Sequence, residues 1–174
     1  MPYTDQEIEA VLPEYAAKGF SLAVQLLGNS DDAADTVQEG LLALWRNRER
    51  LERNRNPRGW FYRVIRNLCV DRLRHRARGK TVTFDETLAP DDAAADPAET
   101  AQRKEYRVRL RHELGNLSPN LREILYLRDF HDLSYTDIAE VLAIPAGTVM
   151  SRLHRARMEL RDRLGRLARR SDRE

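Results

Sequence analysis

Residues 134–157 read SYTDIAEVLAIPAGTVMSRLHRAR, and this stretch decides the class of fold. The pattern predicts two short helices joined by a tight turn. Ser134, followed three residues later by Asp137, resembles a capping box at the start of the first helix. Ile144 and Pro145 interrupt the pattern, and a proline suits the first turn of a new helix because its missing N–H has no bond to make there. The stretch therefore predicts a helix-turn-helix.

The second helix of this pair separates apolar from polar side chains. At about 100° per residue, one narrow arc is apolar and is expected to pack inward; it holds Val149, Leu153, Ala156 and Leu160. The opposite side holds Thr148, Ser151, Arg152 and Arg155. Because an arginine can donate to both acceptors of a guanine edge, this side suits the reading of bases in a DNA major groove. The alternative is a solvated arginine face on an ordinary helical hairpin.

Charge is strongly segregated along the chain, although the net charge is only +2. Residues 46–80 carry thirteen basic residues against three acidic ones, and residues 145–170 carry eight arginines against two acids. Residues 1–45 carry one basic residue and eight acids. The two basic blocks predict two contacts with a polyanion, and the acidic start predicts a basic protein partner. Solvated helix faces would explain any one block better than all three.

Several classes of function find no support in the sequence. Cys69 is the single cysteine, so neither an intramolecular disulfide nor a cysteine-based zinc site is possible. The four histidines lack metal-ligand spacing, and there is no nucleophile–base pair or phosphate-binding glycine loop. We therefore expect no catalytic residue, no metal and no cofactor. No apolar run approaches the length of a membrane span and no signal peptide is visible, which predicts a cytoplasmic chain without membrane insertion.

One segment has the composition of a linker. Residues 81–99, TVTFDETLAPDDAAADPAE, contain two prolines, six acids and no basic residue. Such a segment cannot bury enough apolar surface to fold alone. No long alternation of polar and apolar residues predicts a strand on either side of it. We therefore expect an all-α chain of two small helical domains, residues 1–79 and 102–174, joined by a flexible acidic linker over residues 80–101.

The first half of the N-terminal domain predicts amphipathic helices. Residues 5–27 suggest one or two helices whose inner side holds Ile8, Val11, Leu12, Tyr15, Phe20, Val24 and Leu27. A further helix over residues 31–46 has a core arc of Ala34, Val37, Leu41 and Leu44. Its opposite face holds Asp35, Gln38, Glu39 and Leu42. Leu42, ringed by polar residues, could mark a protein-docking patch, or it could be one of the apolar residues that any surface shows.

The next helix is predicted from Pro57 to about Arg76, with Phe61, Ile65 and Leu68 packed inward. Another side presents Trp60, Arg63, Asn67, Asp71 and Arg74, with Tyr62 nearby. Arginines interleaved with aromatic rings and an amide suit single-stranded nucleic acid, because cations hold phosphates and rings stack on bases. Aromatic residues at helical spacing are more often part of a core, so at least one of Trp60 and Tyr62 is expected to be structural.

Three segments together closely resemble the extracytoplasmic-function sigma factors of bacteria. They are DDAADTVQEGLLALWR (31–46), NPRGWFYRVIRNLCVDRLR (56–74) and LSPNLREILYLRDFHDLSYTDIAEVLAIPAGTVMSRLHRAR (117–157). The first two resemble the sigma-two domain and the third resembles the sigma-four domain. The resemblance implies a non-catalytic subunit that binds core RNA polymerase, directs it to promoters and helps to open the duplex. It also implies three partners: the polymerase (β′ coiled coil and β flap), promoter DNA and an anti-sigma factor.

The resemblance also implies roles for the residues noted above. Asp35, Gln38, Glu39 and Leu42 match the face that docks the β′ coiled coil. Asn67 matches a position that contacts a flipped base of the minus-ten element, with Trp60, Arg63, Asp71 and Arg74 on or beside that face. The minus-thirty-five element is assigned to Thr148, Met150, Ser151, Arg152 and Arg155. Met150 is a departure because the family often has a lysine or arginine there, so either a cationic contact is lost or a thymine methyl contact is gained.

Two other functions remain open from the sequence. One is a stand-alone DNA-binding regulator whose N-terminal half serves for dimerisation. The other is the captive half of a stress switch, held inactive by an anti-sigma factor that inserts between the two domains. Association with core polymerase would separate the first of these from a sigma factor.

Overall fold

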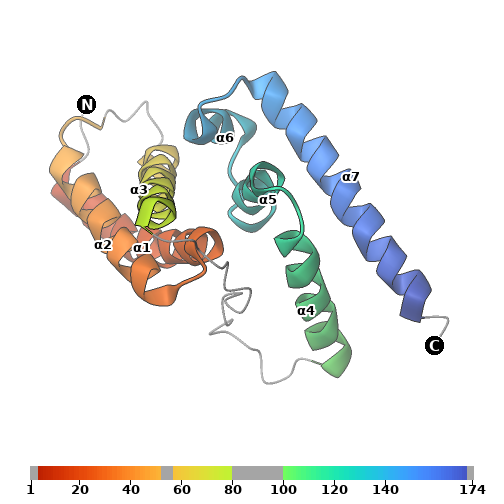
Figure 1. Cartoon of the computed structure of the whole chain (residues 1–174). Helices are drawn as coiled ribbons and strands as arrows, with labels where there is room; N and C mark the ends of the chain where they lie inside the picture. Colours follow the sequence, from red (N-terminus) through yellow and green to blue (C-terminus); the bar gives the residue numbers. More distant parts are fainter. Residues whose placement is uncertain (1–3, 52–56, 80–99, 172–174) are drawn as a thin grey trace.

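The structure, a computed structural model, describes residues 4–51, 57–79 and 100–171, and these contain helices and no strand. The expectation of an all-α chain is confirmed. In chain order the helices are α1 (Asp5–Leu27), α2 (Ser30–Asn47), α3 (Pro57–Gly79), α4 (Ala101–Gly115), α5 (Pro119–Leu125), the π-helical turn η1 (Tyr126–Phe130), α6 (Tyr135–Leu142) and α7 (Ala146–Ser171) (Figure 1). None of these helices combines the length and apolar character that crossing a membrane requires.

The helices α1, α2 and α3 pack against one another and form the N-terminal half. Residues 5–27 form a single helix, which begins at a capping box between Thr4 and Glu7 and ends at Gly28. Gly28 adopts φ 67°, a left-handed conformation that glycine accepts without steric cost. The side chain of Asn29 then accepts a hydrogen bond from the Asp32 N–H at 2.9 Å and caps α2. Gly28 and Asn29 alone therefore connect the two helices.

Two glycines let α1 and α2 approach α3 closely. A Cβ atom on Gly19 would lie 2.9 Å from Cε1 of Phe61, and one on Gly40 would overlap Cδ1 of Ile65. Phe61 and Ile65 are fully buried, and the Phe61 ring stacks on Tyr15 with centroids 5.1 Å apart. The centre of this half is therefore a contact between bulky side chains of α3 and bare backbone of its neighbours.

Three details of the predicted core of this half are wrong. Leu68 is only half-buried, and the neighbouring Cys69 takes the buried position on α3. The buried residues of α2 are Ala33, Thr36, Val37, Gly40 and Leu44, whereas Ala34 and Leu41 are only half-buried. The inner arc is rotated because the helix approaches α3 at Gly40, which carries no hydrophobic side chain. Phe20 is exposed, since Gly19, Leu22 and Ala23 take the inner positions of that part of α1.

The C-terminal half is built on α7, which α4, α5 and α6 all contact (Figure 1). The predicted capping box is present: Ser134 Oγ accepts from the Asp137 N–H at 3.1 Å, and the Asp137 carboxylate accepts from the Ser134 N–H at 3.2 Å. The helix α6 ends at Ala143, whose φ of 52° is left-handed, and Pro145 precedes the first residue of α7. The left-handed residue of the turn therefore lies two positions before the proline, and the predicted helix-turn-helix is confirmed.

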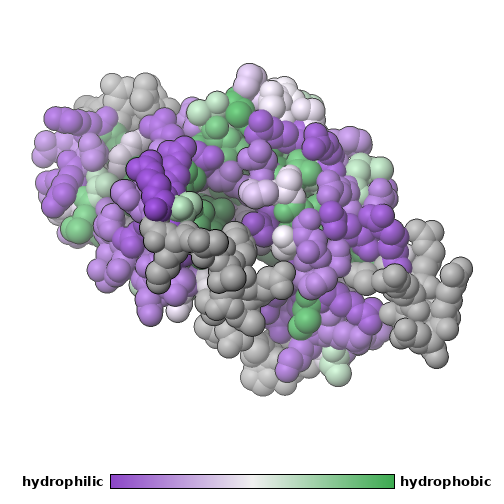
Figure 2. Space-filling view, in the orientation of Figure 1, coloured by the Kyte–Doolittle hydropathy of each residue, from purple (hydrophilic) through white to green (hydrophobic). Residues whose placement is uncertain are grey.

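The two halves contact each other directly, chiefly through α3 and α6. The predicted linker lies outside the described residues except for Thr100 and Ala101, where Thr100 caps α4. In the view of Figure 2 hydrophilic residues cover most of the surface, and apolar residues gather in small patches. Most apolar side chains are accordingly used inside the halves and between them.

Candidate nucleic-acid interfaces

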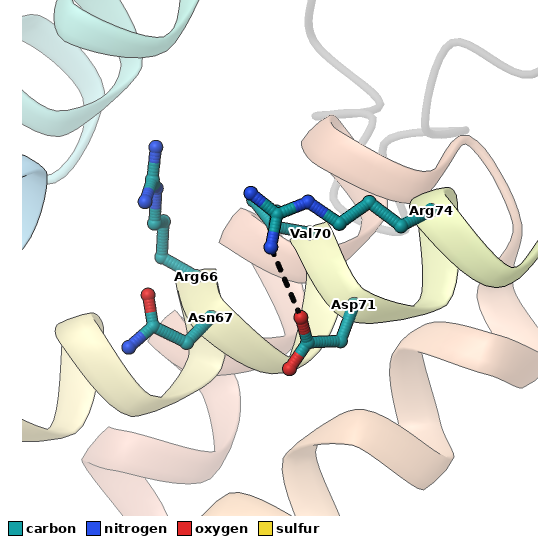
Figure 3. A pocket seen from close by; sticks show the side chains of 5 residues that line it. All are labelled: Arg66, Asn67, Val70, Asp71 and Arg74. Carbon is teal, nitrogen blue, oxygen red and sulfur yellow. Dashed lines mark ion pairs between the residues drawn. The ribbon is translucent and has the colours of Figure 1, made fainter.

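A hollow of about 350 Å³ lies on α3, and the side chains of Arg66, Asn67, Val70, Asp71 and Arg74 line it (Figure 3). Asp71 and Arg74 form an ion pair of 3.5 Å along one side of it. All five residues lie on this one helix, so the hollow is shallow and open, and a flat base or a backbone phosphate can enter it. Its cations, amide and carboxylate can hold a phosphate and hydrogen-bond a base edge.

Three of the five residues predicted for this surface, Asn67, Asp71 and Arg74, are brought together in the hollow. Arg63 is exposed on the same helix but does not line it, and Trp60 is half-buried against the core. Sequence reasoning missed Arg66 and Val70 as lining residues. Each directly precedes a predicted residue on the same helix, and this adjacency is the only signal in the sequence that they line the hollow.

Tyr62 is structural, as expected for at least one of the two aromatic residues. Its ring is buried between the halves, and its hydroxyl lies 3.1 Å from Nδ1 of His131. Burial raises the pKa of this phenol above its ordinary value, partly opposed by the positive charge of Arg58. Tyr62 is therefore a neutral hydrogen-bonding group inside the protein and does not offer a stacking platform.

The first turns of α7 present the second predicted surface. Met150, Ser151 and Arg155 are exposed, with Met150 at 58%, whereas Thr148 and Arg152 are half-buried. Within the described residues, neither Arg152 nor Arg155 has a hydrogen-bonding or ion-pair partner. This surface therefore offers two uncompensated guanidinium groups beside one apolar side chain.

Other arginines of α7 are held by acidic residues. Arg157 binds the Asp129 carboxylate at 2.5 Å, and this hydrogen bond raises the pKa of the guanidinium. Arg163 binds Glu159 at 2.9 Å. Arg157 and Arg163 therefore brace the C-terminal half, whereas Arg152 and Arg155 have no such partner among the described residues.

A third surface lies on α2, where Asp35, Gln38, Glu39 and Leu42 are all exposed. They share the side of the helix opposite to the buried residues Val37 and Leu44. Glu39 accepts a hydrogen bond of 2.5 Å from Arg72 of α3. Leu42 therefore stands as an exposed apolar residue in an acidic and polar setting, as the sequence predicted.

The comparisons with known proteins agree in both halves. The family model for sigma-70 region 2 matches residues 14–79, and that for sigma-70 region 4 matches residues 107–160. The chain is 32% identical to the ECF RNA polymerase sigma factor SigE of Mycolicibacterium smegmatis, over 94% of this chain, and spans 62% of that protein. It is 29% identical to SigW of Bacillus subtilis, over 92% of this chain and 90% of that protein. It is 32% identical to SigL of Mycobacterium tuberculosis, over 88% of this chain and 86% of that protein.

Solved structures extend the agreement to the fold. The sigma factor RpoE of Bartonella quintana, in complex with the anti-sigma factor NepR, superposes with a TM-score of 0.70 at 26% identity, over 92% of this chain and 95% of that one. The structure of CnrH in complex with the cytosolic domain of CnrY gives a TM-score of 0.66 at 22% identity, over 93% of this chain and 90% of that one, and supports the fold alone. With both sigma-70 regions present in order and relatives matched over most of their length, the chain belongs to the extracytoplasmic-function family of RNA polymerase sigma factors.

Proposed function

We propose that this chain binds core RNA polymerase, directs it to specific promoters and promotes opening of the duplex, without catalysis of its own. The observation that carries the proposal is the presence of two separate surfaces for a polyanion, one on each half of a sigma-70 chain. They are the hollow on α3 and the arginines at the start of α7, Arg152 and Arg155, which have no partner among the described residues. Acting with polymerase, the protein works in the cytoplasm.

Each surface has a proposed role. The acidic face of α2 around Glu39 and Leu42 docks the β′ coiled coil of the polymerase. Asn67, with its neighbours in the hollow, holds a base extruded from the minus-ten element. Arg152 and Arg155, with Met150 between the polar residues, read the minus-thirty-five element in the major groove. The exposure of these side chains supports the assignment.

The energetics favour two weak readers carried by a larger enzyme. Extruding a base from the stack costs a few kcal/mol, which neither small half can supply alone. Attachment of both halves to polymerase raises the effective concentration of each reader at its element. The free chain is therefore expected to bind promoter DNA weakly and with strong salt dependence.

An anti-sigma factor is proposed as the second protein partner. A TM-score of 0.70 over 92% of the chain requires both halves to superpose together, so the packed arrangement resembles that of RpoE in its complex with NepR. We expect an inhibitor of this chain to bind across the packed halves and hold them together.

The test is reconstitution with purified core polymerase. Transcript start sites mapped after overexpression supply promoters, and the purified chain plus core is then assayed for co-elution in gel filtration and for run-off transcripts from those promoters. A sigma factor co-elutes and initiates at the mapped sites. A chain that ignores core polymerase and binds one duplex at nanomolar affinity in physiological salt would instead be a stand-alone regulator.

A further inference from the structure

Arg66 belongs to two structures at once. Its side chain lines the hollow on α3 beside Asn67, and its Nε donates a hydrogen bond of 2.9 Å to Oε1 of Glu123 on α5. In Figure 3 the Arg66 side chain extends from α3 away from the Asp71–Arg74 pair. One cation therefore joins the candidate single-strand surface of the N-terminal half to the C-terminal half.

The carboxylate of Glu123 is buried and needs a cationic partner. The residue is 9% exposed, and a carboxylate taken out of water is costly unless a cation and hydrogen bonds compensate it. Arg66 is its ion-pair partner among the described residues. The packed halves thus hold the guanidinium at Glu123, with about a quarter of its side chain (26%) still exposed.

A DNA phosphate and a carboxylate compete for the same group. Both are oxyanions that a guanidinium binds with charge-assisted hydrogen bonds, often two at once. While Arg66 binds Glu123, its fork is turned toward the C-terminal half and is withheld from a strand lying in the hollow. Loss of the contact between α3 and α5 releases the guanidinium beside Asn67.

We propose that Arg66 is a further contact for single-stranded DNA in the hollow, and that Glu123 withholds it while the two halves are packed. The inference rests on the proposed role of the hollow in binding the minus-ten strand. It adds a residue outside the predicted set and an acidic competitor supplied by the chain itself. Opening of the halves then increases the number of cations that the N-terminal half offers to the strand.

The test measures binding of the full chain to a fluorescent 20-nucleotide oligo(dT) by anisotropy at several salt concentrations. Glu123→Gln should tighten binding about fivefold and steepen the dependence of log K on log salt by about 0.7, the effect of one added phosphate contact on a single strand. Arg66→Gln should abolish this gain in the Glu123→Gln background. Glu123→Met, which keeps the volume without an acceptor, repeats the test if Glu123→Gln folds poorly.

Glu105→Gln is the matched control. It removes one negative charge from an ion pair of 2.5 Å with Arg109 on α4, a helix that contributes no residue to the lining of the hollow. A gain for Glu105→Gln equal to that for Glu123→Gln would overturn the inference, because the effect would then be net charge. A gain that survives Arg66→Gln, or no gain at all, would overturn it as well.

A separate arm tests the hollow itself. The double substitution Asn67→Ala and Arg74→Ala, at two residues that line the hollow, should weaken oligo(dT) binding in every background. If it does so while Glu123→Gln has no effect, the hollow binds the strand and the role of Arg66 is refuted. If the double substitution has no effect, the proposed function of the hollow fails, and the inference fails with it.

Discussion

The hydroxyl of Tyr62 and Nδ1 of His131 lie 3.1 Å apart, although 69 positions separate them in the sequence. On the other side of the imidazole, Nε2 lies 3.0 Å from Oε1 of Gln25. With Tyr62 donating to Nδ1 and Nε2–H donating to Gln25, a neutral histidine satisfies both contacts. Arg58 donates to the backbone carbonyl of the same histidine. The packing of the two halves therefore depends on an uncharged imidazole that is 4% exposed.

This histidine should make the packed state sensitive to acid. Burial, reinforced by the positive charges of Arg58 and Lys18, lowers the pKa of His131 from 6.5 to about 4. Below pH 6.5 the opened or unfolded chain binds a proton that the packed chain refuses. The stabilisation is thus complete above pH 6.5 and is lost as the pH falls toward 4, by about 3 kcal/mol in all.

The measurement is the urea unfolding free energy between pH 7.5 and pH 4, for the native chain and for His131→Gln. Glutamine cannot titrate, so the difference between the two curves isolates the histidine from the carboxylates. The native chain should lose stability more steeply between pH 6.5 and 4. Parallel curves would show that His131 is not the sensitive group.

Reversal of charge on α2 should disrupt assembly with polymerase. Glu39 is exposed and its ion pair with Arg72 lies at the surface, so Glu39→Arg should change the free energy of unfolding by no more than about 1 kcal/mol. Binding to core polymerase should fall at least about tenfold, since like charges then meet at the proposed docking face. Competition with a labelled sigma factor for core polymerase measures the effect. Glu105→Arg, which breaks a similar pair on α4, should leave binding unchanged.

Local features of the sequence predicted the elements well. The capping box at Ser134 and the arc of Val149, Leu153 and Ala156 depend on residues within a few positions, and both are present as expected. The predicted buried face of α2 is rotated from the observed one because hydrophobic periodicity gives no weight to Gly40. This glycine lies against Ile65 because it has no side chain. Phe20 was misplaced for the same reason, since Gly19 takes the inner position beside it.

The contacts between the halves could not be predicted in this way. The sequence gives no sign that His131 is buried and hydrogen-bonded, because its partners Gln25 and Tyr62 lie more than sixty positions away. Arg66 likewise shows no local signal in the sequence, and the family resemblance points to its neighbour Asn67. Its partner Glu123 lies 57 positions further along the chain. Pairings of this kind arise from tertiary packing alone, and no local pattern encodes them.

Substitution of two glycines by alanine should change the free energy of unfolding in opposite directions. At Gly40 the new Cβ would overlap Ile65 in the packed centre of the N-terminal half, so Gly40→Ala should lower the free energy of unfolding by about 1–3 kcal/mol. At Gly147, in the first turn of α7, a Cβ meets nothing within 4 Å, so Gly147→Ala should raise it by about 0.5–1 kcal/mol. Urea denaturation of both variants checks the pair. A destabilised Gly147→Ala, or a neutral Gly40→Ala, would contradict the packing described here.

Arg155, an exposed arginine at the start of α7, should discriminate one base pair of the upstream element. Arg155→Ala should cost about 1–3 kcal/mol at a single position of that element and little elsewhere, because a bidentate contact to one guanine would be lost. Binding of reconstituted holoenzyme to promoters varied one base at a time measures the profile. Arg161→Ala removes the same charge from an exposed position further along α7 and should leave the profile unchanged. A uniform loss across all promoters, with a shallower salt dependence, would assign Arg155 to a phosphate instead.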